Sequence, residues 1–308
     1  MKNLTIVMYH YVRPIKDSNY PNIKGLEIEG FKRQLDFLSS QYSIITAEQL
    51  INYSLGKSEL PKNPCYLTFD DGYKDHINFV LPELKLRNIQ GSFFPPARPI
   101  INKELLDVNA IHFILESCTN NSILLSELKK QCLQNGITES HWQELWDANA
   151  IASRYDNNEV IFFKRMLQRE LPFEIRHTIT SELFYQYVGI TEKEFSEELY
   201  MSSDELKILL SEGMYVGSHT FSHNWLDSIS RNEQAIEIDK SLKFLADIGA
   251  LTSDWVMCYP YGAYNEDTLS LLKERDCVIG ITSKVGISDL TVDDPLQLCR
   301  FDTNDFPQ

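Results

Sequence analysis

The chain has 308 residues, of which 43% are hydrophobic and 24% are charged, so it is long enough to bury a substantial core. Its 29 Lys and Arg residues against 44 Asp and Glu residues give a formal net charge of −15. A charge of this sign repels phosphate backbones and anionic membrane surfaces over about 8 Å at physiological salt. We therefore expect no nucleic-acid partner, and the charge is more compatible with a neutral ligand.

The first residues, MKNLTIVMYHYV, form an apolar run that is too short for a signal core or a membrane span. No later segment reaches the roughly 18 uninterrupted apolar residues that a spanning helix needs. The sequence therefore predicts a soluble chain without a membrane span, and a cytoplasmic location if Met1 is the natural start. The six cysteines lie far apart without a CxxC pair, so we expect reduced thiols.

Strand-like and helix-like segments alternate through residues 1–100, which is typical of β/α units around a mainly parallel sheet or barrel. The pattern predicts, in chain order, the strand Leu4–Tyr9, the helix Phe31–Gln41, the strand Ser43–Ile45, the helix Ala47–Tyr53, the strand Cys65–Phe69, the helix Tyr73–Arg87 and the strand Gly91–Phe94.

Residues 101–200 differ, because their apolar residues recur at helical spacing with almost no strand signal. We expect an all-helical insertion there, which acts as a lid or as a dimer contact. The alternation resumes in residues 201–308, with the predicted elements Ser203–Ser211 (helix), Met214–Ser218 (strand), Glu233–Ile248 (helix), Trp255–Tyr259 (strand), Glu266–Glu274 (helix), Cys277–Thr282 (strand) and Leu298–Phe301 (extended).

The strand that begins at Cys65 runs directly into two adjacent carboxylates and a glycine, Asp70-Asp71-Gly72. Carboxylates at the C-terminal end of a barrel strand lie where such folds place their reaction sites, and the glycine allows a sharp turn. Taken alone, Asp-Asp-Gly is more often an ordinary turn.

Two histidines four residues apart, His219 and His223, follow another predicted strand. One turn of helix would bring both imidazoles to the same face. Together with a carboxylate from elsewhere, such a pair suits a divalent metal, although two half-exposed helix histidines are an equally good interpretation of this motif alone. A third strand ends in Cys258-Tyr259-Pro260-Tyr261-Gly262, which could be a simple turn.

The three motifs together resemble the NodB-homology polysaccharide deacetylases, a carbohydrate esterase family. The matching segments are Thr68–Gly72, His219–His223 and Tyr259–Tyr261, in the family's order. The resemblance implies an α/β fold, a deformed (β/α)7 barrel formed by residues 1–100 and 201–308, which the helical insertion of residues 101–200 interrupts.

The resemblance also implies roles for individual residues. Asp71, His219 and His223 would bind a divalent metal, usually zinc, and Asp70 would activate the metal-bound water as the catalytic base. The backbone N–H of Tyr261, in the turn that follows Pro260, would stabilise the oxyanion.

Two positions depart from the family pattern. The family commonly has an arginine that orients the base two residues before the proline of the third motif, where this chain has Cys258. Arg300 is a candidate substitute, and the alternative is an ordinary surface arginine. The late histidine that acts as general acid is also absent, since no histidine follows His223. His10, at the end of the first strand, resembles the early histidine of the rearranged branch that includes poly-N-acetylglucosamine deacetylases.

The expected function is therefore removal of an acetyl group from an N-acetylated sugar or glycan intermediate. The same site could instead cleave an O-acetyl ester or another amide, or the chain could be a glycan-binding protein without activity. The sequence leaves the oligomeric state open.

Overall fold

The computed structural model describes residues 2–118 and 120–308. The chain divides into two compact units. The barrel unit comprises Met1–Ile15, Lys24–Lys103 and Glu197–Gln308, and the helical unit comprises Lys16–Ile23 and Glu104–Ser196. Within the described residues, no helix is both long and apolar enough to cross a membrane.

The strands of the barrel unit are almost all parallel. One series of neighbours is β5 (Tyr215–Val216), β4 (Ser92–Phe94), β3 (Pro64–Asp70) and β1 (Asn3–Tyr9), and a second pair is β6 (Trp255–Cys258) with β7 (Cys277–Ile281). The register aligns Tyr9 with Phe69 and Asp70 with Phe94, so these strands end at the same level. Side chains that directly follow the strands therefore meet at one end of the barrel unit.

Isolated bridges join the two series into a ring. Ser218, just beyond β5, bridges Met257 on β6, and Ile281 on β7 bridges Leu298. Leu298 leads into β9 (Phe301–Asp302), which pairs in parallel with β1. The parallel pairings thus return to their starting strand, and the predicted α/β fold is confirmed. Its deformation lies in two-residue strands and single bridges, and in the antiparallel strand β8 (Ser288–Asp289) at the start of β1.

Alternation along the strands separates the inside of this ring from its outside. Leu4 and Ile6 on β1 pack with Tyr66, inside the ring of strands. Val7 and Tyr9 point the other way and pack against helical residues. Because both faces are covered, the strands are nearly continuous apolar runs in the sequence.

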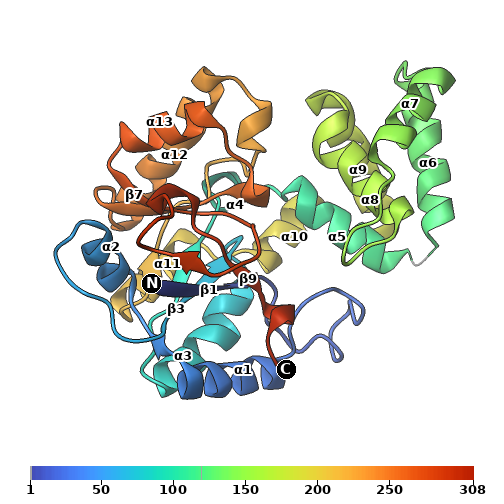
Figure 1. Ribbon diagram of the computed structural model, residues 1–308. Coiled ribbons are helices and arrows are strands. Elements are labelled where there is room, and N and C mark those ends of the chain that lie inside the picture. Colours follow the sequence, from blue (N-terminus) through green and yellow to red (C-terminus); the bar gives the residue numbers. More distant parts are fainter. Residues whose placement is uncertain (1, 119) are drawn as a thin grey trace. The chain divides into compact units, whose positions relative to one another are not determined.

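Helices surround the strands of the barrel unit (Figure 1). Their bounds are α1 (Ile28–Gln41), α2 (Ala47–Ser54), a π-helical turn (His76–Val80) that continues into α3 (Leu81–Leu86), α4 (Ala97–Asn102), α11 (Ser203–Ser211), α12 (Arg231–Ile248) and α13 (Glu266–Lys273). Three of these helices begin with a capping box, since Thr46, Ser202 and Asn265 each accept a hydrogen bond from the backbone of their helix. The predicted helix at Tyr73–Arg87 is present from Lys74, and its first part includes the π-helical turn.

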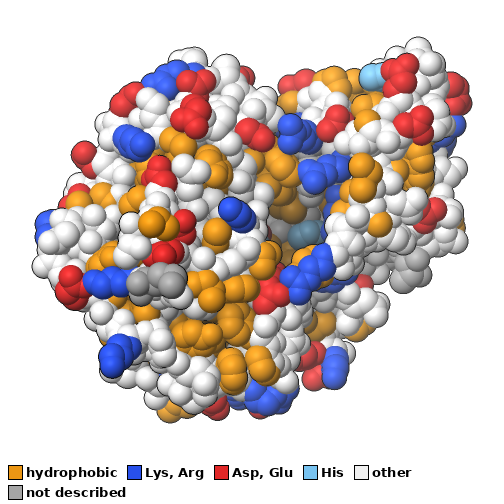
Figure 2. All heavy atoms as spheres, in the orientation of Figure 1, with side chains coloured by type: hydrophobic (Ala, Val, Ile, Leu, Met, Phe, Trp, Pro, Cys, Tyr) orange, Lys and Arg blue, Asp and Glu red, His pale blue; other side chains and the backbone are white. Residues whose placement is uncertain are grey.

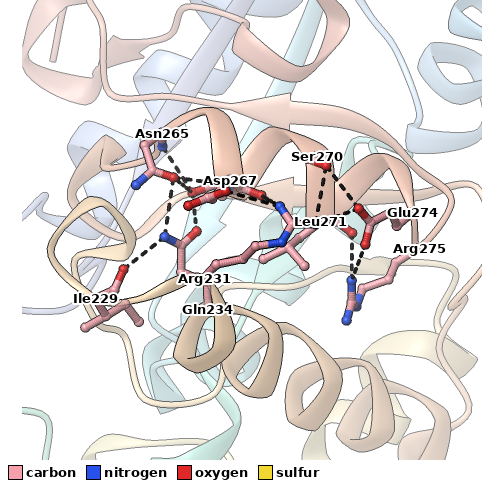
Figure 3. Close-up of polar contacts among 10 residues, drawn as sticks. Ile229, Arg231, Gln234, Asn265, Asp267, Ser270, Leu271, Glu274 and Arg275 are labelled. Atoms are coloured by element: carbon pink, nitrogen blue, oxygen red, sulfur yellow. Dashed lines mark hydrogen bonds and ion pairs between the residues drawn. The ribbon is translucent and has the colours of Figure 1, made fainter.

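A buried polar cluster joins α12 to α13 (Figure 3). The Gln234 amide donates to the carbonyl of Ile229 at 3.1 Å, and its oxygen accepts from the Thr268 hydroxyl at 2.6 Å. Gln234 and Thr268 are both fully buried. Nearby on the surface, Arg231 reaches Glu274 at 2.7 Å, where both side chains are largely exposed.

We expect Gln234→Ala to lower the free energy of unfolding by about 2–3 kcal/mol, because the Ile229 carbonyl loses its donor and the buried Thr268 hydroxyl loses one of its two acceptors. The surface variant Arg231→Ala should cost less than about 1 kcal/mol. Urea unfolding of both variants measures the difference. Equal losses would contradict the assignment of the stabilising contact to the buried cluster.

The helical unit contains α5 (Asp107–Ser117), α6 (Asn121–Gln134), α7 (Glu139–Asn149), α8 (Asn158–Arg165), a π-helical turn (Met166–Glu170) and α9 (Phe173–Val188), and α10 (Glu192–Leu199) begins in it. Helix α5 packs against α9, and α8 packs against α6 and α7. Between residues 101 and 199, the described residues include no strand, as predicted. A role of this unit as a lid or a dimer element stays a prediction.

Charged side chains of both signs are interspersed on the face of the molecule that Figure 2 draws. The surface also carries exposed ion pairs, such as Lys243 with Asp247 at 2.7 Å. Pairs of this kind contribute little to stability. The picture therefore shows no large area of a single charge sign on this face.

Candidate metal centre and its surroundings

Asp70 is the last residue of β3, and Asp71 and Gly72 follow it in the left-handed backbone conformation, each with φ of 68°. A Cβ on Gly72 would lie 2.7 Å from the Pro95 Cβ, so the turn needs glycine both for its φ and for its space. The turn leaves both carboxylates buried in the barrel unit.

His219 and His223 converge on Asp71, although the predicted helical turn between them is wrong. The segment is an irregular loop in which Thr220 and His223 have φ of 62° and 59°. The Nε2 atoms of His219 and His223 lie 3.5 and 3.4 Å from the Asp71 Oδ1. The two imidazoles therefore come together through the conformation of this loop and not through one turn of helix.

The remaining nitrogen of His219 fixes the direction of its ring. Its Nδ1 lies 2.6 Å from the carbonyl oxygen of Cys258, and a carbonyl only accepts, so Nδ1 carries the proton. The lone pair is then on Nε2, which faces Asp71. A backbone carbonyl behind an imidazole is a common way to orient a metal ligand.

These three side chains form a donor set that fits a divalent metal. One ligand atom from each lies within 4.8 Å of the others, and all three residues are buried. Among the described residues, Asp71 Oδ1 is buried and has no hydrogen-bond partner. Burial lowers the pKa of His223 to about 3, so its imidazole is neutral at physiological pH. Two neutral nitrogens and one carboxylate oxygen are a set that zinc accepts, and they leave further positions open.

Asp70 lies beside this group and has its own buried partners. The Arg300 Nη1 is 2.7 Å from Asp70 Oδ2, and the Cys258 thiol donates to Asp70 Oδ1 at 3.4 Å. Burial is the largest single influence on the pKa of Asp70 and raises it. Arg300 is the largest of several influences that lower it, and together these hold this pKa below its usual value. Arg300 is only 3% exposed, so the interpretation as a surface arginine is wrong.

His10 approaches the same carboxylate from the solvent side. Its Nε2 lies 3.9 Å from Asp70 Oδ2, and 38% of its side chain is exposed. The backbone carbonyl of His10 lies 2.9 Å from His76 Nε2, and His76 is fully buried. His10 therefore lies at the solvent-exposed edge of the site, and His76 is buried behind the His10 backbone.

Pro260 and Tyr261 form a short 3-10 turn after β6, in which Tyr261 has φ of 57°. The Tyr261 ring packs edge-on against His223 at 4.7 Å between centroids and stacks on Trp225 at 4.4 Å. The third motif therefore contacts the second. Asp71, Thr220, His223 and Tyr261, all with positive φ, gather at this one place, as is typical of functional sites.

Sequence reasoning missed two residues here, Tyr73 and Trp225. Tyr73 directly follows Gly72, and its hydroxyl donates to Asp71 Oδ2 at 2.5 Å. Trp225 lies two residues after His223 and stacks on Tyr261. The sequence signal that could have indicated these two residues is their position directly beside the Asp-Asp-Gly and His-x-x-x-His motifs.

The fold and the site together define an α/β-barrel protein with a candidate divalent-metal centre at the ends of its strands. The family model described as polysaccharide deacetylase matches residues 176–278, which include His219, His223 and Tyr261. Over these residues the chain is therefore similar to the polysaccharide deacetylase family, the resemblance that its motifs predicted. Asp70, Asp71, His10 and Arg300 lie outside the matched residues.

Related proteins agree with this family. The protein YxkH of Bacillus subtilis (strain 168), which is named after the same family, is 27% identical over 94 residues. That match covers 30% of this chain and 33% of YxkH, so the chain spans about a third of that relative's length.

Solved deacetylase structures share the fold. The deacetylase PplD of Streptococcus pyogenes has a TM-score of 0.59 at 16% identity, with 97% of this chain and 92% of that chain covered. IcaB from Ammonifex degensii has a TM-score of 0.58 at 18% identity, with 97% and 91% covered. The BpsB deacetylase domain from Bordetella bronchiseptica has a TM-score of 0.56 at 16% identity, with 98% and 96% covered.

Proposed function

We propose that this chain is a metal-dependent hydrolase that removes the acetyl group from an N-acetylated sugar or glycan intermediate. The observation that carries the proposal is the buried cluster of Asp71, His219 and His223 with the Asp70–Arg300 pair beside it. The PplD structure that shares this fold is in complex with acetate, which would be one product of the proposed reaction.

Asp71, His219 and His223 would hold the metal, for which we propose zinc. A divalent ion in such a site polarises a carbonyl oxygen and lowers the pKa of a water towards about 7. Asp70, kept ionised by Arg300, would accept the proton of that water. The backbone N–H of Tyr261 would donate to the oxyanion, and Pro260 would keep the turn rigid.

His10 would protonate the leaving amine, because it is the histidine next to Asp70 and stays in contact with solvent. Water and the N-acetyl group are then converted to acetate and a free amine. The cytoplasmic location stays a prediction.

Acetate release from a panel of N-acetylhexosamine monomers and oligomers tests the proposal. We expect release with zinc present, loss of release after dialysis against a chelator, and recovery on adding zinc back. O-acetylated sugars belong in the same panel, because preferential release from them would support the esterase alternative. No release from the whole panel by protein with zinc bound would rule out the deacetylase.

A further inference from the structure

Tyr73 contacts the metal-binding carboxylate from the side opposite the histidines. It is fully buried, and its hydroxyl donates to Asp71 Oδ2 at 2.5 Å. The other oxygen, Asp71 Oδ1, faces the Nε2 atoms of His219 and His223. The two oxygens of one carboxylate therefore have different partners.

The Tyr73 ring is held by other rings on several sides. It stacks on Tyr11 at 4.2 Å between centroids and on Tyr200 at 6.2 Å, and it packs edge-on against His76 at 5.7 Å. A backbone bridge also joins Tyr73 to Tyr200. Because a packed ring cannot turn freely, its hydroxyl stays at one place.

We propose that Tyr73 is a positioning residue that makes Asp71 a metal ligand through one oxygen only. This inference rests on the proposed metal site. A carboxylate can bind a cation through one or both oxygens, and a donor bonded to Oδ2 favours binding through Oδ1 alone. Binding through one oxygen leaves a position on the metal for water and substrate, as a catalytic site requires.

The test is Tyr73→Phe, which keeps the ring stacking and removes only the hydroxyl. We expect zinc affinity, measured by competition with a chromophoric chelator, to fall about 10-fold to 100-fold. With cobalt in place of zinc, the visible absorption of the variant should weaken and shift, because a second carboxylate oxygen raises the coordination number. Packing changes alone would not produce that spectrum.

Tyr9→Phe is the matched control. Tyr9 is also fully buried and stacked, on Phe69 at 5.0 Å, but its hydroxyl has no hydrogen-bond partner in the part of the chain that the structure describes. This control should keep the wild-type zinc affinity and cobalt spectrum. If Tyr73→Phe also kept both, the positioning role would be wrong while the proposed function stood. If the wild-type protein bound neither metal, the proposed function and this inference would both be wrong.

Discussion

Asp70→Asn should lower the rate of acetate release by about 100-fold to 10,000-fold, the range typical of a lost general base. The amide keeps the shape of the carboxylate but cannot accept a proton from water. Zinc affinity should change little, because Asp71, His219 and His223 are untouched. Steady-state kinetics with zinc titration in parallel measures both quantities.

Asp75→Asn is the control for this variant. Asp75 is another buried carboxylate with an arginine partner, since Arg13 Nε lies 2.6 Å from its Oδ2. This change should lower stability and leave the turnover of folded protein close to wild type. Full activity of Asp70→Asn would contradict the role as base and would support a glycan-binding protein without catalysis.

Arg300→Met should lower kcat/KM at neutral pH by about 10-fold to 1000-fold and move the acid limb of the pH profile to higher pH. In the wild-type protein, burial raises the pKa of Asp70, and Arg300 is the largest of the influences that together bring it below its usual value. Without that charge the effect of burial remains, so Asp70 takes up its proton at a higher pH. Since the base acts when deprotonated, activity should partly recover as the pH rises.

Loss of a buried partner can also destabilise the fold, by about 3–5 kcal/mol when a charge is left unpaired. The position of the acid limb separates the two effects, because a smaller folded fraction lowers the rate without moving the limb. Adding Arg300→Met to Asp70→Asn should cost little further activity if Arg300 acts through Asp70. An unchanged limb would show that Arg300 does not control the base.

The two histidines show how far local sequence patterns can predict a site. Their four-residue spacing correctly indicated that the imidazoles converge, but for the wrong reason, since the segment is a loop with positive φ at Thr220 and His223. Spacing encodes a helical face only when the backbone is helical. Here the hydrogen bond from His219 to the Cys258 carbonyl orients the ring instead.

Arg300 shows the opposite case. Its neighbours in the chain do not distinguish a surface arginine from a buried partner of Asp70, which is 230 residues away in sequence. Pairing of β9 with β1, and of β1 with β3, places Arg300, just before β9, where its side chain reaches Asp70 at the end of β3. Long-range strand pairing of this kind leaves no local periodic signal.

The sequence by itself determined the alternation of strands and helices, the helical character of residues 101–200, and the three motifs that identify the family. Apolar periodicity, capping residues and short motifs are local, so they can be read from neighbouring residues. Only the tertiary structure decided that Arg300 and Cys258 contact Asp70, that Tyr73 binds one oxygen of Asp71, and that His10 lies beside Asp70. These contacts depend on strand register and ring packing, which are set by the whole barrel rather than by any one segment.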